Sequence, residues 1–270
     1  MSDKMIALTE EDLARYRIQE DIPRYIEQSR EALGLPRNRM RVLDLGCGRG
    51  EAVIRLRERG YDAYGVDIDS RYIENGRSLL QQRGWDPAVL TRIDAGRIGF
   101  PDAHFHFIFT DQVLEHVEDL PAAVAEMARL SAAGAGGFHS FPARRHPIED
   151  HIRMPFVHYL PKNGLRRALI LACVALGCEP RWDHLAGMGV AERARQYYEY
   201  SVGQTFYRPH LAVKRCFEDH GFRGAFVTIH KSSWRRLPLA GLVARARGGL
   251  SAIEWALLNF RSVDILTQRI

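Results

Sequence analysis

The sequence predicts an α/β fold built on a doubly wound, mostly parallel sheet. Short apolar runs alternate along the chain with amphipathic segments, which is typical of parallel strands covered by helices on both faces. Acidic residues follow the early runs at the points where such folds bind their ligands. The 270 residues with 46% hydrophobic content supply one substantial core but would divide awkwardly into two large domains.

Residues 1–36 are expected to form a helical lid over the sheet. Thr9 followed by Asp12 makes a capping-box-like helix start, and Leu13 and Tyr16 place apolar side chains among charges. Pro23 is expected to break or restart this helix.

Residues 37–141 carry the alternating pattern and are expected to form the core of the fold. The run Met40–Leu45 is apolar and is followed at once by glycines, as expected of a buried parallel strand that enters a tight turn. The pattern then predicts a helix at 51–59, a strand at 62–66, a helix at 71–82, a strand at 105–110, a helix at 120–130 and a strand at 137–141.

The regular pattern ends in residues 142–210 and returns in residues 211–270. The first of these regions is rich in His, Arg and aromatic residues, and we expect it to be a substrate-facing insertion. The second predicts a helix at 211–220 ended by Gly221, then strands at 222–230 and 261–267 that complete the core. These last strands are expected to form an antiparallel hairpin at the sheet edge.

The segment Val42–Gly50 gives the most specific signal in the chain. A strand delivers Asp44 directly before Gly46, Gly48 and Gly50, and glycines allow a sharp turn and close approach of a ligand to the backbone. A pyrophosphate would favour a helix N-terminus with no acid nearby. An acid before GxGxG therefore favours a cationic ligand, such as a sulfonium with an ammonium group.

This segment resembles the class I S-adenosylmethionine-dependent methyltransferases, in particular the subgroup with DLGCGxG and the LEHV sequence present here at 114–117. The resemblance implies a Rossmann-like, seven-stranded sheet and S-adenosylmethionine as cofactor. It also implies that Asp67 binds the ribose hydroxyls, that Ile68 lies beside the adenine, and that Asp94 accepts from the adenine amine. The implied cofactor-binding residues are Asp44, Gly46, Cys47, Gly48, Gly50, Asp67, Ile68, Asp94, Ala95 and Asp111.

Methyl transfer from a sulfonium is a direct displacement, so the protein must align the acceptor and, for a hydroxyl, help to remove its proton. Histidines are the candidates for proton removal. The candidate histidines are His116 after the fourth strand and His139, His146, His151 and His158 on or after the fifth. We predict Glu115, His116 and His151 as catalytic, the alternative for each being packing or hydrogen bonding below the cofactor.

A divalent metal is an alternative to a histidine acting alone. Two branches of the subgroup, the small-RNA 2′-O-methyltransferases and the ubiquinone-pathway O-methyltransferases, bind metal through an ExxEH segment and a later His. Gln112 stands here at the place of the first acid, and a neutral amide is a poorer ligand for a hard cation. We therefore assign no metal ligand and favour a histidine base.

The acceptor is expected to contact the insertion, which contains clustered arginines and aromatic residues. Arginines bind phosphate or carboxylate, and aromatic rings supply flat apolar walls. This mixture suits a glycan, a phosphate-bearing intermediate or an amphipathic lipid-linked acceptor, and we predict O-methylation of a small molecule, a glycan or a lipid-linked intermediate. The alternatives are an RNA 2′-O-methyltransferase and a non-catalytic module that binds S-adenosylmethionine, although we find no dedicated RNA-binding motif.

Charge and cysteine content bear on partners and compartment. A net charge of +5 is small for a dedicated nucleic-acid binder, and the four cysteines show neither CxxC nor zinc spacing. The N-terminus lacks an apolar signal core, so we expect a cytoplasmic protein. Two apolar, Arg-flanked segments at 165–177 and 237–260 suggest peripheral contact with the inner membrane face, or else core helices or a homodimer interface, which are commoner.

Overall fold

The computed structural model describes residues 8–93, 97–230, 243–244, 246 and 248–270, and it contains one seven-stranded sheet. The sheet order is β3-β2-β1-β4-β5-β7-β6. The strands are β1 (Arg41–Leu45), β2 (Asp62–Asp67), β3 (Leu90–Arg92), β4 (Phe105–Asp111), β5 (Ser131–Pro142), β6 (Phe222–Phe226) and β7 (Ser262–Arg269). Strands β1 to β5 pair in parallel, and β7 is antiparallel to β5 and β6.

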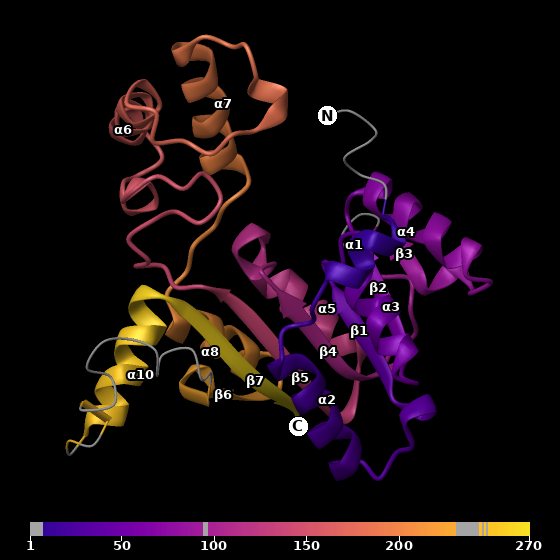
Figure 1. The fold of residues 1–270 in the computed structure, drawn as a ribbon. Helices are drawn as coiled ribbons and strands as arrows, with labels where there is room; N and C mark the ends of the chain where they lie inside the picture. The colour runs from indigo at the N-terminus through magenta and orange to yellow at the C-terminus, as the bar shows by residue number, and fades with distance from the viewer. Residues whose placement is uncertain (1–7, 94–96, 231–242, 245, 247) are drawn as a thin grey trace.

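This architecture confirms the predicted fold class, and Figure 1 shows helices on both faces of the sheet. The described helices are α1 (Glu10–Arg15), α2 (Asp21–Ala32), α3 (Glu51–Glu58), α4 (Ser70–Gln82), α5 (Leu120–Leu130), α6 (Gly164–Ala175), α7 (Val190–Gly203), α8 (His210–Asp219) and α10 (Gly249–Phe260). The edge pair β6 and β7 is present as predicted. Its connection contains α10, so it is not a tight hairpin.

Two hydrophobic clusters cover the two faces of the sheet. Val42 and Phe107 belong to the cluster packed against α2, α3 and α4, whereas Leu43 and Ile108 belong to the cluster packed against α5 and α8. Successive strand residues point to opposite faces, and both sets are buried. The continuous apolar runs in the sequence therefore reflect strands covered on both sides.

Three element boundaries differ from the sequence-based expectation. Pro23 lies in the first turn of α2, where its missing N–H needs no helical partner, so the helix starts just ahead of it. Strand β5 starts six residues earlier than predicted, at Ser131, and its Gly137 packs so closely that a Cβ there would lie 2.4 Å from Thr267 Oγ1. Strand β6 ends at Phe226, before a 3₁₀ turn.

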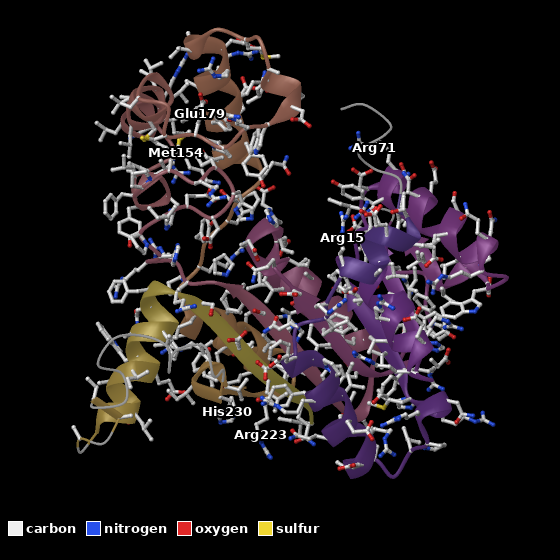
Figure 2. All side chains as sticks on the ribbon, viewed as in Figure 1. Arg15, Arg71, Met154, Glu179, Arg223 and His230 are labelled. Atoms are coloured by element: carbon white, nitrogen blue, oxygen red, sulfur yellow. The ribbon has the colours of Figure 1, made fainter. Side chains whose placement is uncertain are left out.

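The insertion between β5 and α8 has a core of its own. Helices α6 and α7 pack together with Ile152, Met154 and Val157 around buried Tyr197. Figure 1 shows these two helices beside each other and away from the helices that flank the sheet. In Figure 2, Met154 and Glu179 of the insertion lie opposite Arg15 and Arg71 of the N-terminal half. The helical insertion predicted from the sequence is therefore a separately packed unit.

Candidate functional site

The carboxyl ends of three neighbouring strands bring together Asp44, Asp67 and Asp111. Their strands stand in the order β2-β1-β4, and the direction in which the chain adds strands reverses between β1 and β4. Doubly wound sheets bind ligands at this switch point. Burial raises the pKa of Asp44 well above its usual range, and the carboxylates of Asp111 and Asp67 raise it further. The concentrated negative charge suits a cationic ligand.

The glycine loop is held by a hydrogen bond to Asp67. Gly46, Gly48 and Gly50 have φ values of +85°, +54° and +82°, which favour glycine. The Gly48 N–H donates to Asp67 Oδ2 at 2.8 Å, and the Asp69 N–H donates to Oδ1 at 2.9 Å. A Cβ on Gly46 would overlap Val113, whereas one on Gly48 would enter open space. The loop therefore has a closed side and an open side.

The other residues assigned to the cofactor differ in how they are placed. Cys47 is buried, with its Sγ against Gly65 and donating to Gly48 O at 3.6 Å and its N–H donating to Val66 O, so its side chain packs under the loop. Ile68, beside Asp67, is 74% exposed, which leaves an apolar surface open to a ligand. Asp94 and Ala95 lie outside the described residues.

The structure brings the three predicted catalytic residues together. Glu115 and His116 belong to a 3₁₀ turn just after β4, and His151 comes from the start of the insertion. One side-chain nitrogen or oxygen from each lies within 4.8 Å of the others. The two imidazole rings meet edge to face with centroids 4.6 Å apart. The cluster lies directly after the strand that ends in Asp111.

His151 is held by a buried carboxylate. Its Nδ1 lies 2.9 Å from Glu149 Oε1, and Glu149 also accepts from the backbone N–H groups of His151 and Ile152 and from the Tyr207 hydroxyl at 2.6 Å. Burial lowers the pKa of His151, but the hydrogen bond and charge of Glu149 outweigh it, so the net shift is upward. With Nδ1–H directed at Glu149, Nε2 keeps its lone pair and can accept a proton.

The other two members of the cluster have different electrostatic surroundings. His116 Nδ1 donates to Gln204 O at 2.6 Å, and burial lowers the pKa of this imidazole. Glu115 is buried, and neither carboxyl oxygen has a hydrogen-bond partner among the described residues. Burial raises the pKa of Glu115 to about 7. These three residue types can also ligate a divalent cation, whereas Gln112 lies at an exposed position.

The sequence analysis did not identify Glu149 or Tyr207 as parts of the site. It also named His139 as a candidate base, whereas the structure gives this residue a different place. Glu149 stands two residues before His151, a spacing that could have suggested the pair, whereas the distant Tyr207 gave no signal. His139 is buried between Thr110 and Thr267, and burial lowers its pKa to about 3. It therefore belongs to the sheet core.

A cavity of about 610 Å³ lies between α4 and the insertion, close to the histidines. Tyr72 of α4 lines one side, and Trp182, Tyr200 and Gln204 of the insertion line the other. The ring of Tyr200 lies 6.0 Å from that of His151, and the carbonyl of Gln204 is the one that binds His116. The cavity therefore offers aromatic walls to a molecule bound near the cluster.

Comparison with known proteins places these features in a family. A family model described as a methyltransferase domain matches residues 16–224. A demethylmenaquinone methyltransferase from Roseiflexus sp. (strain RS-1) is 32% identical over 152 residues, 55% of this chain and 59% of that protein. A probable chloroplastic tocopherol O-methyltransferase from Oryza sativa subsp. japonica is 32% identical over 96 residues, 35% of this chain and 26% of that protein. The chain thus spans about a quarter to three fifths of these relatives.

Solved structures share the fold at low identity. A geranyl diphosphate C-methyltransferase from Streptomyces coelicolor A3(2) is 13% identical with a TM-score of 0.52, covering 92% of this chain and 81% of that one. An S-adenosylmethionine-dependent methyltransferase from Mesorhizobium loti is 15% identical with a TM-score of 0.52, covering 90% and 98%. Since the family model covers most of the chain and the sheet has the matching architecture, the chain belongs to the class I S-adenosylmethionine-dependent methyltransferases.

Proposed function

We propose that the protein transfers the methyl group of S-adenosylmethionine to an oxygen atom of a small-molecule acceptor. The observation that carries this proposal is the pair formed by His151 and buried Glu149, which lies beside Glu115 and His116 at the carboxyl end of β4. A histidine held by a carboxylate is suited to accept the proton of a hydroxyl group. The acid-lined loop at the neighbouring strand ends supplies a site for the sulfonium.

The proposed reaction assigns each bond change to a group. S-adenosylmethionine bound at the glycine loop would supply the methyl group and leave as S-adenosylhomocysteine, and His151 Nε2 would accept the proton of the acceptor hydroxyl as its oxygen is methylated. Glu149 stabilises the imidazolium that forms, and the Tyr207 hydroxyl orients Glu149 through their 2.6 Å hydrogen bond. The proton returns to solvent after product release.

The cofactor is proposed to lie over the open side of the glycine loop. Asp67 would accept from both ribose hydroxyls, and exposed Ile68 would cover one face of the adenine. Asp44 and Asp111 would face the cationic end. Tyr16 is proposed to close this site from the lid, because burial and then the nearby carboxylates of Asp44 and Asp111 raise its pKa.

The acceptor is proposed to enter the cavity between α4 and the insertion. Its aromatic walls and volume suit a small planar or apolar molecule. The other proposed acceptor classes are glycans and lipid-linked intermediates, and one experiment distinguishes all of them. Incubation with labelled S-adenosylmethionine and an extract of the source cells, followed by mass identification of the labelled product, identifies both the acceptor and the methylated atom. A carbon- or nitrogen-methylated product would overturn the oxygen assignment.

A metal-assisted form of the reaction is the second candidate, because Glu115, His116 and His151 lie close enough to share one cation. A bound divalent ion would act as a Lewis acid on the acceptor hydroxyl. Turnover that survives chelator treatment supports the histidine base. Loss of turnover with chelator and its recovery with added divalent metal would favour this second candidate.

Membrane or homodimer contact is proposed for the exposed side of α6. Leu165, Leu171 and Leu176 are exposed there, but Arg166, one of the two arginines expected to flank that face, is buried against Ser201 and Leu160 carbonyls. None of the helices in the described ranges combines the length and apolarity that crossing a bilayer requires. Sedimentation with liposomes separates membrane contact from self-association, which is measured by analytical ultracentrifugation.

A further inference from the structure

A second cavity, of about 530 Å³, lies inside the insertion and is lined by cationic side chains. Its charged lining residues are Arg144, Lys162, Arg166 and Arg208, and its lining contains no aspartate or glutamate. Arg144 follows β5, Lys162 and Arg166 lie at the start of α6, and Arg208 lies between α7 and α8. Three separate parts of the chain therefore bring positive charge to one cavity.

Three of these cations are held by neutral carbonyl groups. Lys162 Nζ donates to Val202 O and Thr205 O, the latter at 3.0 Å. Arg166 donates to Leu160 O and Ser201 O. The guanidinium of Arg208 donates to the carbonyl oxygens of Leu114, Phe206 and Glu118. These bonds fix the cations in place but do not cancel their charge.

Arginines elsewhere in the described chain behave differently. Arg83 pairs with Glu10 and Glu58, and Arg129 pairs with Asp102 and Glu126. Within the described residues, none of the four cavity cations has such a carboxylate partner. Arg166 is only 5% exposed, and the charge of Glu149 acts on it without a direct ion pair, so its buried charge is only partly offset. The cavity is thus built with an excess of positive charge.

The cations also repel one another, and a neutral histidine adjoins them. Burial lowers the pKa of Lys162, and the charges of Arg166 and Arg208 lower it further. His158 also lines the cavity, and burial lowers its pKa to about 4, so its ring is neutral near pH 7. An anion in the cavity would relieve the repulsion and offer acceptors to these donors.

We propose that this cavity binds a phosphate or diphosphate group. Several cations converging on one small space suit a group with more than one negative charge, and the planar fork of exposed Arg144 matches phosphate oxygens. The site deepens the proposed function, since Tyr207 has its ring in this cavity and its hydroxyl on Glu149, beside His151. The phosphate therefore belongs to a molecule that reaches the catalytic cluster or to a lipid headgroup near it.

The test uses inorganic pyrophosphate as the probe and calorimetry on the full chain without cofactor. Arg144→Gln is the primary variant, because Arg144 is exposed and no hydrogen bond or ion pair of its side chain appears among the described contacts. It is expected to weaken pyrophosphate binding at least tenfold. Arg167→Gln is the matched control: Arg167 is exposed, carries the same charge, and lies outside the cavity lining. If both variants weaken pyrophosphate binding equally, the binding depends only on net charge, and the proposed site is wrong.

A vesicle arm distinguishes the two sources of the phosphate. Binding of pyrophosphate that Arg144→Gln weakens identifies a soluble phosphate compound. Binding only to vesicles of phosphatidic acid in phosphatidylcholine, weakened in the same variant, identifies a lipid headgroup. Binding to neither probe overturns the proposal. Since pyrophosphate binding is measured without methyl transfer, its failure leaves the methyltransferase proposal standing, and a failed methylation assay leaves the phosphate site standing.

Discussion

The cofactor half and the insertion gather ionisable side chains of opposite sign at their two sites. In the cofactor half, Asp44, Asp67 and Asp111 converge at three strand ends, and the carboxylates of Asp111 and Asp67 add to the effect of burial in raising the pKa of Asp44. In the insertion, cationic side chains converge on the second cavity, and three of them are bonded to carbonyls. The comparison teaches that each half is electrostatically prepared for a different ligand, with the Glu115, His116 and His151 cluster between them.

The largest expected effect comes from His151, where the two halves meet. His151→Ala is expected to lower turnover by ~10²-fold or more, because the proton acceptor is lost. Calorimetry with S-adenosylhomocysteine should show unchanged affinity. His146→Ala is the matched control, since His146 bonds only to local groups of its own loop. Parental turnover in His151→Ala would place the base elsewhere.

The next effect concerns stability, and it tests the buried acid of the cluster. The folded pKa of Glu115 is about 7, against 4.5 for an ordinary glutamate, so the folded state holds the proton more tightly than the unfolded state. Stability is therefore expected to fall as pH rises from about 4.5 to 7, by up to ~3 kcal/mol for this group.

Glu115→Gln removes that titration while keeping the shape of the protonated acid. The variant is expected to match the parent in unfolding free energy near pH 4.5 and to exceed it above pH 7. Chemical denaturation at the two pH values measures the difference. If the variant and the parent have the same unfolding free energy at both pH values, the charged Glu115 carboxylate is already stabilised by other groups in the folded protein.

Asp67 tests the negative half of the comparison. Asp67→Ala is expected to weaken S-adenosylhomocysteine binding by about 1.5 to 3 kcal/mol, because the ribose hydroxyls lose a charged acceptor. Pyrophosphate affinity should stay unchanged in the same variant, whereas Arg144→Gln should show the opposite pattern. Asp102→Ala is a control of equal charge on the far surface. Crossed effects in either variant would contradict the separation of the two sites.

The smallest effect is expected for Tyr207→Phe, a positioning change. Loss of the hydroxyl removes one hydrogen bond from Glu149, at a cost of about 0.5 to 1.5 kcal/mol, so turnover should fall less than about tenfold. Glu149 then interacts more strongly with His151, and the pKa of that imidazole should rise. In the profile of kcat/KM against pH, the rising limb should move to higher pH. A fall in turnover without this shift would point to a purely structural role.

The sequence predicted the cofactor half far better than the insertion, for a physical reason. Strands buried on both faces need apolar runs, and tight loops need glycine. The structure of the segment from Met40 to Gly50 can therefore be predicted from its local sequence alone. The position of Glu115 and His116 after a strand could also be read from the sequence, because the two residues are adjacent and follow an apolar run, whereas their catalytic role stays a prediction. The role of Tyr207 depends on how the insertion folds back onto residues 114–118, which no local pattern encodes.

The cation-lined cavity could be predicted only in part for the same reason. The arginines of the insertion stand out in the sequence, but the separation of Arg208 from Arg144 hides their convergence. Arg166, which lies in the apolar, Arg-flanked segment 165–177, is buried because two backbone segments supply its carbonyl partners. The placement of a long cationic side chain depends on tertiary contacts more than on its neighbours in sequence.

The segment 204–208 contributes residues to both cavities, and this arrangement has a thermodynamic consequence. Its Gln204 carbonyl holds His116, its Phe206 N–H donates to Glu115 O at 2.6 Å, and its Arg208 lines the cationic cavity. A ligand that shifts this segment from one side must shift the groups on the other. Binding linkage is reciprocal, so whatever factor an anion imposes on acceptor affinity, the acceptor imposes on the anion. If binding shifts this short stretch of chain, the occupancy of one cavity changes the affinity of the other.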